Sequence, residues 1–314
     1  MTDAFESFDL AAFERARGAQ RRAAAKQLDR ICRTTGFLIL AGHGVPEAVI
    51  RGVRDQATAF FAQPAAAKQA LTPEPGAPYG YLGPGAEALA KSRGDDTPPD
   101  LKESFNGGPL AVPAGLDDPD ALAFCFASTP WPDLPGFRTA WQAYYAAMED
   151  LAARIMVAFA AALDLPEDHF APLIDAPISA MRALNYPATG PSAEDGQQRA
   201  GAHTDYGSLT ILAPQPGSRG LEIFAPSGAW VPVPVPEGRF VINIGDLMAH
   251  WTNGRWVSTL HRVVHVPDQP ARQSLAFFHQ PNWDAWIAPL DGAGGAAPVQ
   301  SGPYLMQKFR AATH

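Results

Sequence analysis

The chain has 314 residues, of which 46% are hydrophobic and 18% are charged, a composition typical of globular rather than disordered proteins. The formal net charge is −8 and no basic tract occurs, which argues against nucleic acid as a partner. Because there are only two cysteines, no apolar signal core at the N-terminus and no apolar run of about 18 residues, we expect a cytoplasmic protein without disulfides or a membrane span.

Residues 1–130 are predicted to form a helical and loop-rich region that makes one compact unit with a catalytic domain over 131–314. Within it, residues 72–135 combine dense proline and glycine with scattered aromatic side chains. A long connection of this kind is more often the wall or lid of a site than a linker. The elements predicted before it are a short strand at 8–10, a helix over 12–35, a buried strand over 37–40, a helix from Pro46 to Phe61 and a short helix from Pro64.

A long helix is predicted after Pro135. Apolar residues from Phe137 to Ala162 recur at alternating intervals of four and three, which gives one continuous apolar stripe. Such a stripe favours packing behind a sheet, so we expect this helix to be structural and not catalytic.

The second half of the chain is predicted to consist of short strands joined by turns. Asn253-Gly254, between two apolar stretches, is its strongest β-hairpin signal. Seven or eight short strands favour a double-stranded β-helix (jelly-roll) core, so the predicted fold is mainly β with flanking helices, the last over 301–311. The predicted strands are 179–186, 203–213, 221–225, 229–233, 239–244, 257–266 and 272–280.

One histidine-aspartate pair and a later histidine form the candidate metal site. His203 and Asp205 are two residues apart on a predicted strand, so their side chains project from the same face. His261, from a strand beside them, would complete three ligands, and two imidazoles with one carboxylate are the ligand set of non-haem Fe(II) oxygenases. His265 lies on the same strand face as His261 and is the alternative, but the context Ser-Thr-Leu-His-Arg-Val favours His261. Structural or loop positions are expected for the other internal histidines considered, His43, His250 and His279.

Arg272 and Ser274 form an Arg-x-Ser pair on one face of the last predicted strand. Apolar segments lie on both sides of the pair, and an unpaired guanidinium in such a setting is costly. A guanidinium binds a carboxylate through two parallel hydrogen bonds, and a hydroxyl can add another. The pair therefore indicates a binding site for a carboxylate.

With these residues in place, the sequence resembles the iron(II)/2-oxoglutarate-dependent dioxygenases of the isopenicillin N synthase-like family. The resemblance extends from about Phe8 to Asp284, and Asn243, Gly245 and Asp246 match it as turn residues behind the site. Its segments are Asn185-Tyr186-Pro187, HTDYGSLTIL (203–212), GLEIF (220–224), NIGDLMAHWTNGRWVSTLHRVV (243–264) and RQSLAFFHQPNWD (272–284), with N-terminal counterparts in GFLILAGHGVP (36–46) and DLKESFN (100–106).

The resemblance implies an enzyme with Fe(II) at the two-histidine, one-aspartate site and with 2-oxoglutarate and O₂ as cosubstrates. The far carboxylate of 2-oxoglutarate would bind to Arg272, Ser274 and Tyr186. The expected reaction oxidises a small-molecule metabolite by hydroxylation, desaturation or ring closure, with release of succinate and CO₂. Two alternatives are an oxidase of the same fold that uses O₂ without 2-oxoglutarate, and a non-catalytic jelly-roll protein that holds a structural metal or zinc.

The substrate wall is predicted from positions that resemble substrate-facing positions in the family. A charged group of the substrate is expected to meet Arg182 or Glu103. We expect a monomer, or at most a weak homodimer, that acts on a small molecule and binds neither nucleic acid nor membrane. The predicted wall residues are Arg182, Glu103, Phe105, Tyr206 and Phe278.

Overall fold

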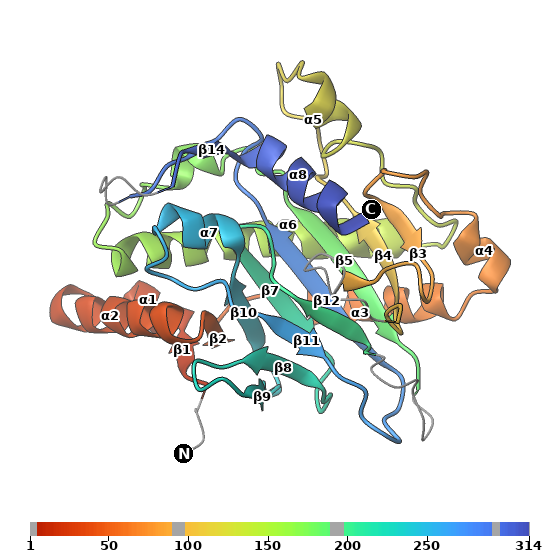
Figure 1. The fold of residues 1–314 in the computed structure, drawn as a ribbon, viewed down its shortest axis with the longest axis horizontal. Helices are drawn as coiled ribbons and strands as arrows, with labels where there is room; N and C mark the ends of the chain where they lie inside the picture. The colour runs from red at the N-terminus through yellow and green to blue at the C-terminus, as the bar shows by residue number, and fades with distance from the viewer. Residues whose placement is uncertain (1–4, 90–97, 189–197, 291–295, 314) are drawn as a thin grey trace.

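A computed structural model describes residues 5–89, 98–188, 198–290 and 296–313. Figure 1 shows the N-terminal helices beside a large twisted sheet, with the C-terminal helix α8 across one end of the strands. None of the helices in the described ranges is long and apolar enough to span a membrane. The helices are α1 (Leu10–Arg15), α2 (Gly18–Thr34), α3 (Glu47–Phe61), α4 (Ala65–Gln69), α5 (Pro119–Ala123), α6 (Phe137–Ala162), η2 (Ala171–Leu173, a 3₁₀ turn), α7 (Asp246–Trp251) and α8 (Ser301–Thr313).

Two sheets face each other, as expected for a jelly roll, and strands from the first half of the chain extend the larger sheet at both edges. The large sheet has the strand order β1-β2-β10-β7-β12-β5-β4-β3, and the small one β6-β11-β8-β9; β13 and β14 pair separately. The strands are β1 (Ser7–Asp9), β2 (Phe37–Ala41), β3 (Gly80–Leu82), β4 (Glu103–Gly107), β5 (Ala180–Tyr186), β6 (Ala200–His203), β7 (Leu209–Pro214), β8 (Leu221–Phe224), β9 (Trp230–Pro232), β10 (Phe240–Ile244), β11 (His261–Val263), β12 (Arg272–His279), β13 (Trp286–Ile287) and β14 (Val299–Gln300).

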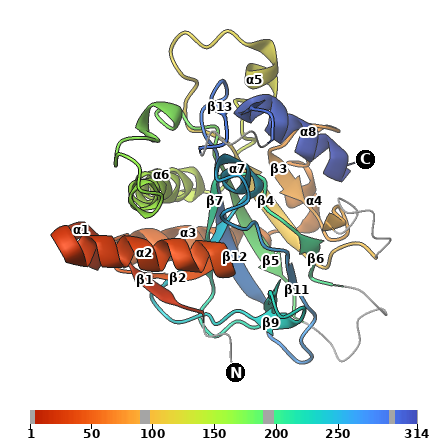
Figure 2. The same cartoon turned by 60° about the vertical axis from the view of Figure 1, so that its left-hand side comes forward.

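The two faces of the large sheet bury different sets of side chains. One face packs on α6, where Met181, Ile211 and Phe277 join the large hydrophobic core of the helices. The other face meets the small sheet, and its Leu184 and Ala276 form a separate apolar cluster with residues of β8 and β11. Figure 2 shows α6 on one side of the large sheet and β9 and β11 on the other. The predicted supporting role of the long helix is therefore confirmed.

Several predicted boundaries differ from the structure. The helix expected over 12–35 is two helices separated at Ala16–Arg17, and Gly18 starts the second with a φ of 52°. The strand expected over 203–213 is two strands, β6 and β7, and only His261–Val263 of the strand expected over 257–266 is extended in a ladder.

The hairpin predicted at Asn253-Gly254 is wrong. Both residues have positive φ, 50° and 75°, but they end α7, where the Gly254 N–H donates to the Ala249 carbonyl at 2.8 Å. The left-handed backbone that a tight hairpin requires is the same one that terminates a helix, so this dipeptide signals either structure. His250, expected in a loop, lies within this helix.

Candidate active site

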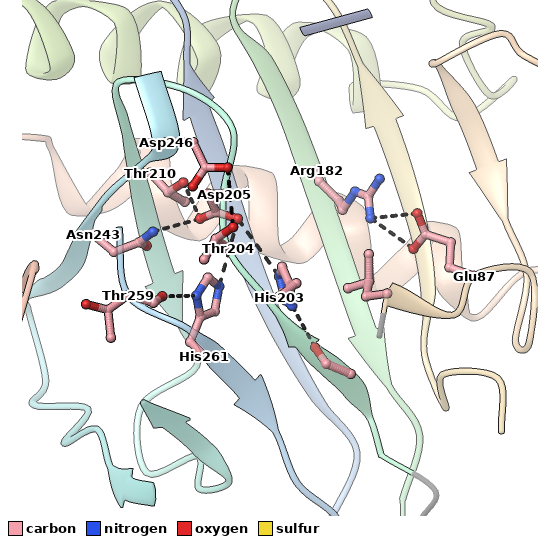
Figure 3. Close-up of polar contacts among 12 residues, drawn as sticks. Glu87, Arg182, His203, Thr204, Asp205, Thr210, Asn243, Asp246, Thr259 and His261 are labelled. Atoms are coloured by element: carbon pink, nitrogen blue, oxygen red, sulfur yellow. Dashed lines mark hydrogen bonds and ion pairs between the residues drawn. The ribbon is translucent and has the colours of Figure 1, made fainter. Parts of the chain in front are cut away.

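His203, Asp205 and His261 converge at one point between the two sheets (Figure 3). His203 ends β6 and His261 begins β11, and the two residues are direct partners in the antiparallel ladder. Asp205 Oδ1 lies 3.9 Å from His203 Nε2 and 3.8 Å from His261 Nε2. One ligand atom from each residue lies within 4.8 Å of the others, so the three can share a metal ion.

Hydrogen bonds on the far side of each ligand fix its orientation. Each ring uses Nδ1 toward the carbonyl two residues before it, His203 to Gly201 at 2.6 Å and His261 to Thr259 at 3.1 Å. A proton on Nδ1 leaves the Nε2 lone pair facing Asp205, which is the arrangement a metal requires. Burial, together with the neighbouring imidazole of His261, holds the pKa of His203 well below its ordinary value, so its ring is neutral at pH 7.

Asp205 presents one oxygen to the site and uses the other for support. Its Oδ2 accepts hydrogen bonds from Thr210 Oγ1 at 2.5 Å and from Asn243 Nδ2 at 2.8 Å. Burial opposes ionisation, but the two imidazoles and these hydrogen bonds outweigh it and lower the pKa of Asp205. Two imidazoles and a carboxylate fit Fe(II).

Arg272 lies further inside, with its guanidinium in a buried position. Its carbon Cζ is 4.2 Å from the centre of the Tyr186 ring, and Tyr186 is its direct partner across the β5–β12 ladder. Nη1 is 3.3 Å from Ser274 Oγ, while Nε has no hydrogen-bond partner, and no carboxylate of the described residues forms an ion pair with this side chain. Burial lowers the pKa of Arg272. A buried guanidinium in this state is suited to an anionic ligand.

Arg199 is a second buried cation at this end, which the sequence analysis did not identify. Its guanidinium lies 5.4 Å from the centre of the Tyr186 ring, and burial together with Arg272 lowers its pKa to about 10. Its hydrogen bonds go to Gln269 and to the Pro187 carbonyl. Two guanidiniums beside one tyrosine make this end of the site favourable for negative charge.

Three neighbouring cavities connect these groups. An outer cavity of about 170 Å³ reaches His203 and Asp205, and a middle one of about 80 Å³ also touches His261 and extends to Tyr186. The inner cavity of about 30 Å³ contains Arg272 and shares Tyr186 with the middle one. The three cavities therefore follow one another, and the candidate metal ligands lie between the outer cavity and the end that contains the buried arginines.

Three of the five predicted wall residues, Arg182, Tyr206 and Phe278, line the outer cavity. The other two do not, and those predictions are wrong. Glu103 faces the opposite side of β4, where its carboxylate bonds Lys68 Nζ at 2.7 Å. Phe105 is fully buried on that same side among the aromatic rings of α3 and α6. The two residues alternate with Ser104 and Asn106, so the pleat directs them away from the cavity.

Arg182 was predicted to meet a charged group of the substrate, but its positive charge is already paired. Its Nη1 donates to both carboxylate oxygens of Glu87, at 3.0 and 2.9 Å, so the cation already has a counter-ion within the chain (Figure 3). Lys102 links Glu87 at 3.1 Å to Asp100 at 2.6 Å. No spacing in the sequence indicated this network, because its members come from different strands and loops.

The other histidines considered as ligands, His43, His265 and His279, lie outside the site. His43 accepts from the Val45 N–H and bonds the Gly238 carbonyl, as expected for a structural residue. His279 is buried on the helix-facing side of β12, where it bonds Ser208 Oγ at 2.6 Å. His265 is not part of the cluster that the three candidate ligands form.

Comparisons with known proteins agree with this geometry. Residues 178–281 match the 2OG-Fe(II) oxygenase superfamily, and residues 6–134 match the N-terminal region of a non-haem dioxygenase in morphine synthesis. Validamycin A dioxygenase from Streptomyces hygroscopicus subsp. limoneus is 33% identical over 320 residues, which cover 98% of this chain and 86% of that protein. The chain belongs to the 2OG-Fe(II) oxygenase superfamily.

A plant hydroxylase and a fungal crystal structure are also similar to this oxygenase. Homoarginine-6-hydroxylase 2-ODD-233 from Oryza sativa subsp. japonica is 33% identical, over 90% of this chain and 87% of its own. The crystal structure of a full-length Neurospora crassa protein in complex with alpha-KG superposes with a TM-score of 0.85 at 29% identity, covering 98% of this chain and 96% of that one. This oxygenase therefore uses Fe(II), 2-oxoglutarate and O₂, and its substrate is a small molecule.

Proposed function

We propose that His203, Asp205 and His261 hold the Fe(II) of this oxygenase, and that Arg272 binds the far carboxylate of 2-oxoglutarate. The observation that carries the second assignment is the buried guanidinium of Arg272, which has no anionic partner among the described residues. Burial of a lone cation is costly unless an anion joins it. Ser274 and Tyr186 contact the same guanidinium and can donate hydroxyl hydrogen bonds to that carboxylate.

When bound, iron and 2-oxoglutarate supply the oxidation, in which O₂ is consumed and a substrate C–H bond is oxidised with release of succinate and CO₂. The protein positions the participants. Thr210 and Asn243 orient Asp205 through its second oxygen, and the backbone carbonyls at Gly201 and Thr259 orient the two rings. Hydroxylation is the default outcome, and desaturation or ring closure requires only a different substrate pose.

The outer cavity is the proposed substrate site, since it opens beside His203 and Asp205. Phe278, Tyr206 and the α8 side chain Phe309 enclose it and exclude water from the reacting carbon. Its size suits a small metabolite, and other structures of the similar Neurospora crassa protein contain thymine or 5-formyluracil. We further propose a monomer that acts in the cytoplasm, consistent with two buried free cysteines, and that binds no nucleic acid, consistent with the net charge of −8.

An Arg272→Leu variant tests the cosubstrate assignment. Loss of a charge-assisted, two-point contact should raise the Kd for 2-oxoglutarate at least tenfold, since such contacts are worth about 1.5–3 kcal/mol. Binding is measured by anaerobic titration of the Fe(II)-loaded protein, and Arg272→Lys should recover part of the affinity. Arg262→Leu is the matched control, because Arg262 pairs with Glu222 at 2.9 Å away from the cavities.

An unchanged 2-oxoglutarate affinity in Arg272→Leu would show that the cosubstrate binds elsewhere. Stoichiometry gives an independent check: one succinate should form for each O₂ consumed with substrate, whereas an oxidase of the same fold would form none.

A further inference from the structure

Two buried amide side chains line the outer cavity with polar atoms that have no hydrogen-bond partner in the part of the chain that the structure describes. Asn106 is only 4% exposed, and neither its Oδ1 nor its Nδ2 has a hydrogen-bond partner among the described residues. Gln280 is 3% exposed, and its Oε1 is also unpaired among them. Each buried polar atom left unpaired costs about 1–3 kcal/mol, and most such atoms in folded proteins are paired. These atoms therefore point to a ligand that pairs with them.

The strand register places Asn106 on the reacting side of the sheet. Asn106 is the direct cross-strand partner of Arg182, and Arg182 is in turn the partner of Ala276 on β12. Phe278, two residues further along β12, shares that face and lines the cavity with His203. A molecule held at Asn106 therefore lies in the same cavity as two of the proposed metal ligands.

The guanidinium of Arg182, which lines this cavity, is already paired with a carboxylate of the chain. Arg182 and Lys102 are paired with Glu87 and Asp100, which are two cations and two anions. Burial opposes ionisation of Glu87, but the two cations outweigh it and lower its pKa to about 2, so its carboxylate stays charged and keeps Arg182 occupied. Among the described lining residues, no other Lys or Arg side chain is present to bind an anionic substrate.

We propose that Asn106 binds the substrate and selects a neutral molecule with a carboxamide-type group, such as a lactam, a cyclic imide or a primary amide. The Asn106 Nδ2–H donates to the substrate carbonyl while Oδ1 accepts from the adjacent substrate N–H. In a primary amide, Gln280 Oε1 accepts the second N–H. Apolar side chains such as Ile178 and Leu305 cover the rest of the molecule. This inference rests on the proposed function, because it makes the outer cavity the substrate site.

Three probes that share a 4-methylphenyl group and differ in their polar group test whether the cavity prefers an amide. The probes are 4-methylbenzamide, which offers a donor and an acceptor, 4-methylacetophenone, which offers only an acceptor, and the anion 4-methylbenzoate. Binding to the Fe(II)- and 2-oxoglutarate-loaded full chain is measured by calorimetry without O₂. The amide should bind at least tenfold more tightly than the ketone or the carboxylate.

Substitutions of Asn106 and Gln280 test which of the two residues produces the amide preference. Asn106→Leu should remove most of the amide preference over the ketone, and Gln280→Met should reduce the amide affinity severalfold and leave the ketone unchanged. In the double variant the amide and the ketone should bind equally. Equal binding of the three probes to the unmodified protein, absence of amide binding, or an undiminished amide preference in Asn106→Leu overturns the proposal.

Stability separates substrate binding from a structural role for Asn106. Replacing an unpaired buried amide by an apolar group of similar size should leave Tm unchanged or raise it. Asn185→Leu is the matched control, because Asn185 donates to Glu103 at 2.8 Å on the other face of the sheet; it should lower Tm and keep the amide preference. A drop in Tm for Asn106→Leu as large as that for Asn185→Leu would show that Asn106 has a structural partner and would overturn the proposal.

A 2-oxoglutarate titration of the same samples distinguishes failure of this inference from failure of the proposed function. Binding of 2-oxoglutarate is titrated first, without any probe. Failure to bind 2-oxoglutarate contradicts the proposed function, whereas normal binding of 2-oxoglutarate without an amide preference contradicts only the role of Asn106.

Discussion

At the scale of single residues, the second oxygen of Asp205 determines how the first is presented to the metal. Thr210 and Asn243 both donate to Oδ2, which turns Oδ1 toward the two imidazoles. Asn243→Leu removes one of these donors and should weaken Fe(II) binding by about 10–100-fold, the usual effect of losing such a supporting contact. An anaerobic Fe(II) titration measures this, and an unchanged affinity would show that Asp205 needs no support from Asn243.

His261, which begins β11, and His265, which lies just after its end, offer a matched comparison. His261→Ala should abolish both Fe(II) binding and turnover, because it removes one of three ligands. His265→Ala should retain both, since His265 lies after the end of β11 and outside the cluster. Metal content after reconstitution, measured together with O₂ uptake, checks the pair, and loss of iron in His265→Ala would reverse the assignment.

The proposed ligands are predictable from the sequence, but their supports are not. The two-residue period of a strand predicts that His203 and Asp205 project together, and the family resemblance identifies His261. In the structure Asp205 lies just after the end of β6 and still reaches the site. Asn243 reaches Asp205 only because β10 pairs with β7, opposite Thr210. Sheet order of this kind is not encoded in local spacing, so the sequence alone indicates only a turn residue at Asn243.

At the scale of elements, local signals predict segments better than their ends. The long helix is predicted within two residues of its start because its apolar stripe is continuous. The Asn253-Gly254 dipeptide misleads because a helix end and a hairpin require the same left-handed backbone. The separation of α1 from α2 lacks a strong breaker apart from Gly18, which follows it directly.

Helix α6 contains an acid whose burial makes stability depend on pH. Burial raises the pKa of Glu149 to about 7 from an ordinary 4.5, and no cation of the described residues forms an ion pair with it. The folded protein therefore holds a proton there that the unfolded chain loses, and stability declines as pH rises from 4.5 to 7. Glu149→Gln should remove this decline and add about 1–2 kcal/mol at pH 8, after allowance for partial exposure.

Urea denaturation at pH 5 and pH 8 measures that difference. Asp150→Asn is the control on the same helix, because Asp150 is exposed and lies 3.7 Å from Arg154. If Glu149→Gln and the unmodified protein lost stability equally between the two pH values, the buried carboxyl would not be its source.

At the scale of the whole molecule, the large sheet separates the candidate active site from the hydrophobic core that supports it. Side chains on one face reach the row of cavities, and those on the other pack into the helical core. Adjacent residues of β4 therefore have unrelated roles, with Asn106 in the cavity lining and Phe105 in the core. The sequence resemblance places β4 at the substrate wall, but a strand's two faces are distinguished only by its register with β5.

Glu103 gives the sharpest test of this separation. Its carboxylate bonds Lys68, accepts from the Tyr81 hydroxyl at 2.6 Å and accepts from Asn185, all on the helical side. Glu103→Gln keeps the shape but leaves Lys68 without its anion in a mostly buried place, so unfolding free energy should fall by about 3 kcal/mol. The affinities for 2-oxoglutarate and for the amide and ketone probes should stay unchanged.

The control is Glu222→Gln, which breaks a more exposed pair with Arg262 and should lower the free energy of unfolding by less than about 1 kcal/mol in urea titrations. A Glu103→Gln variant that kept its stability but changed the probe preference would place Glu103 at the substrate, as the resemblance implied, and would contradict the division of the sheet into two faces.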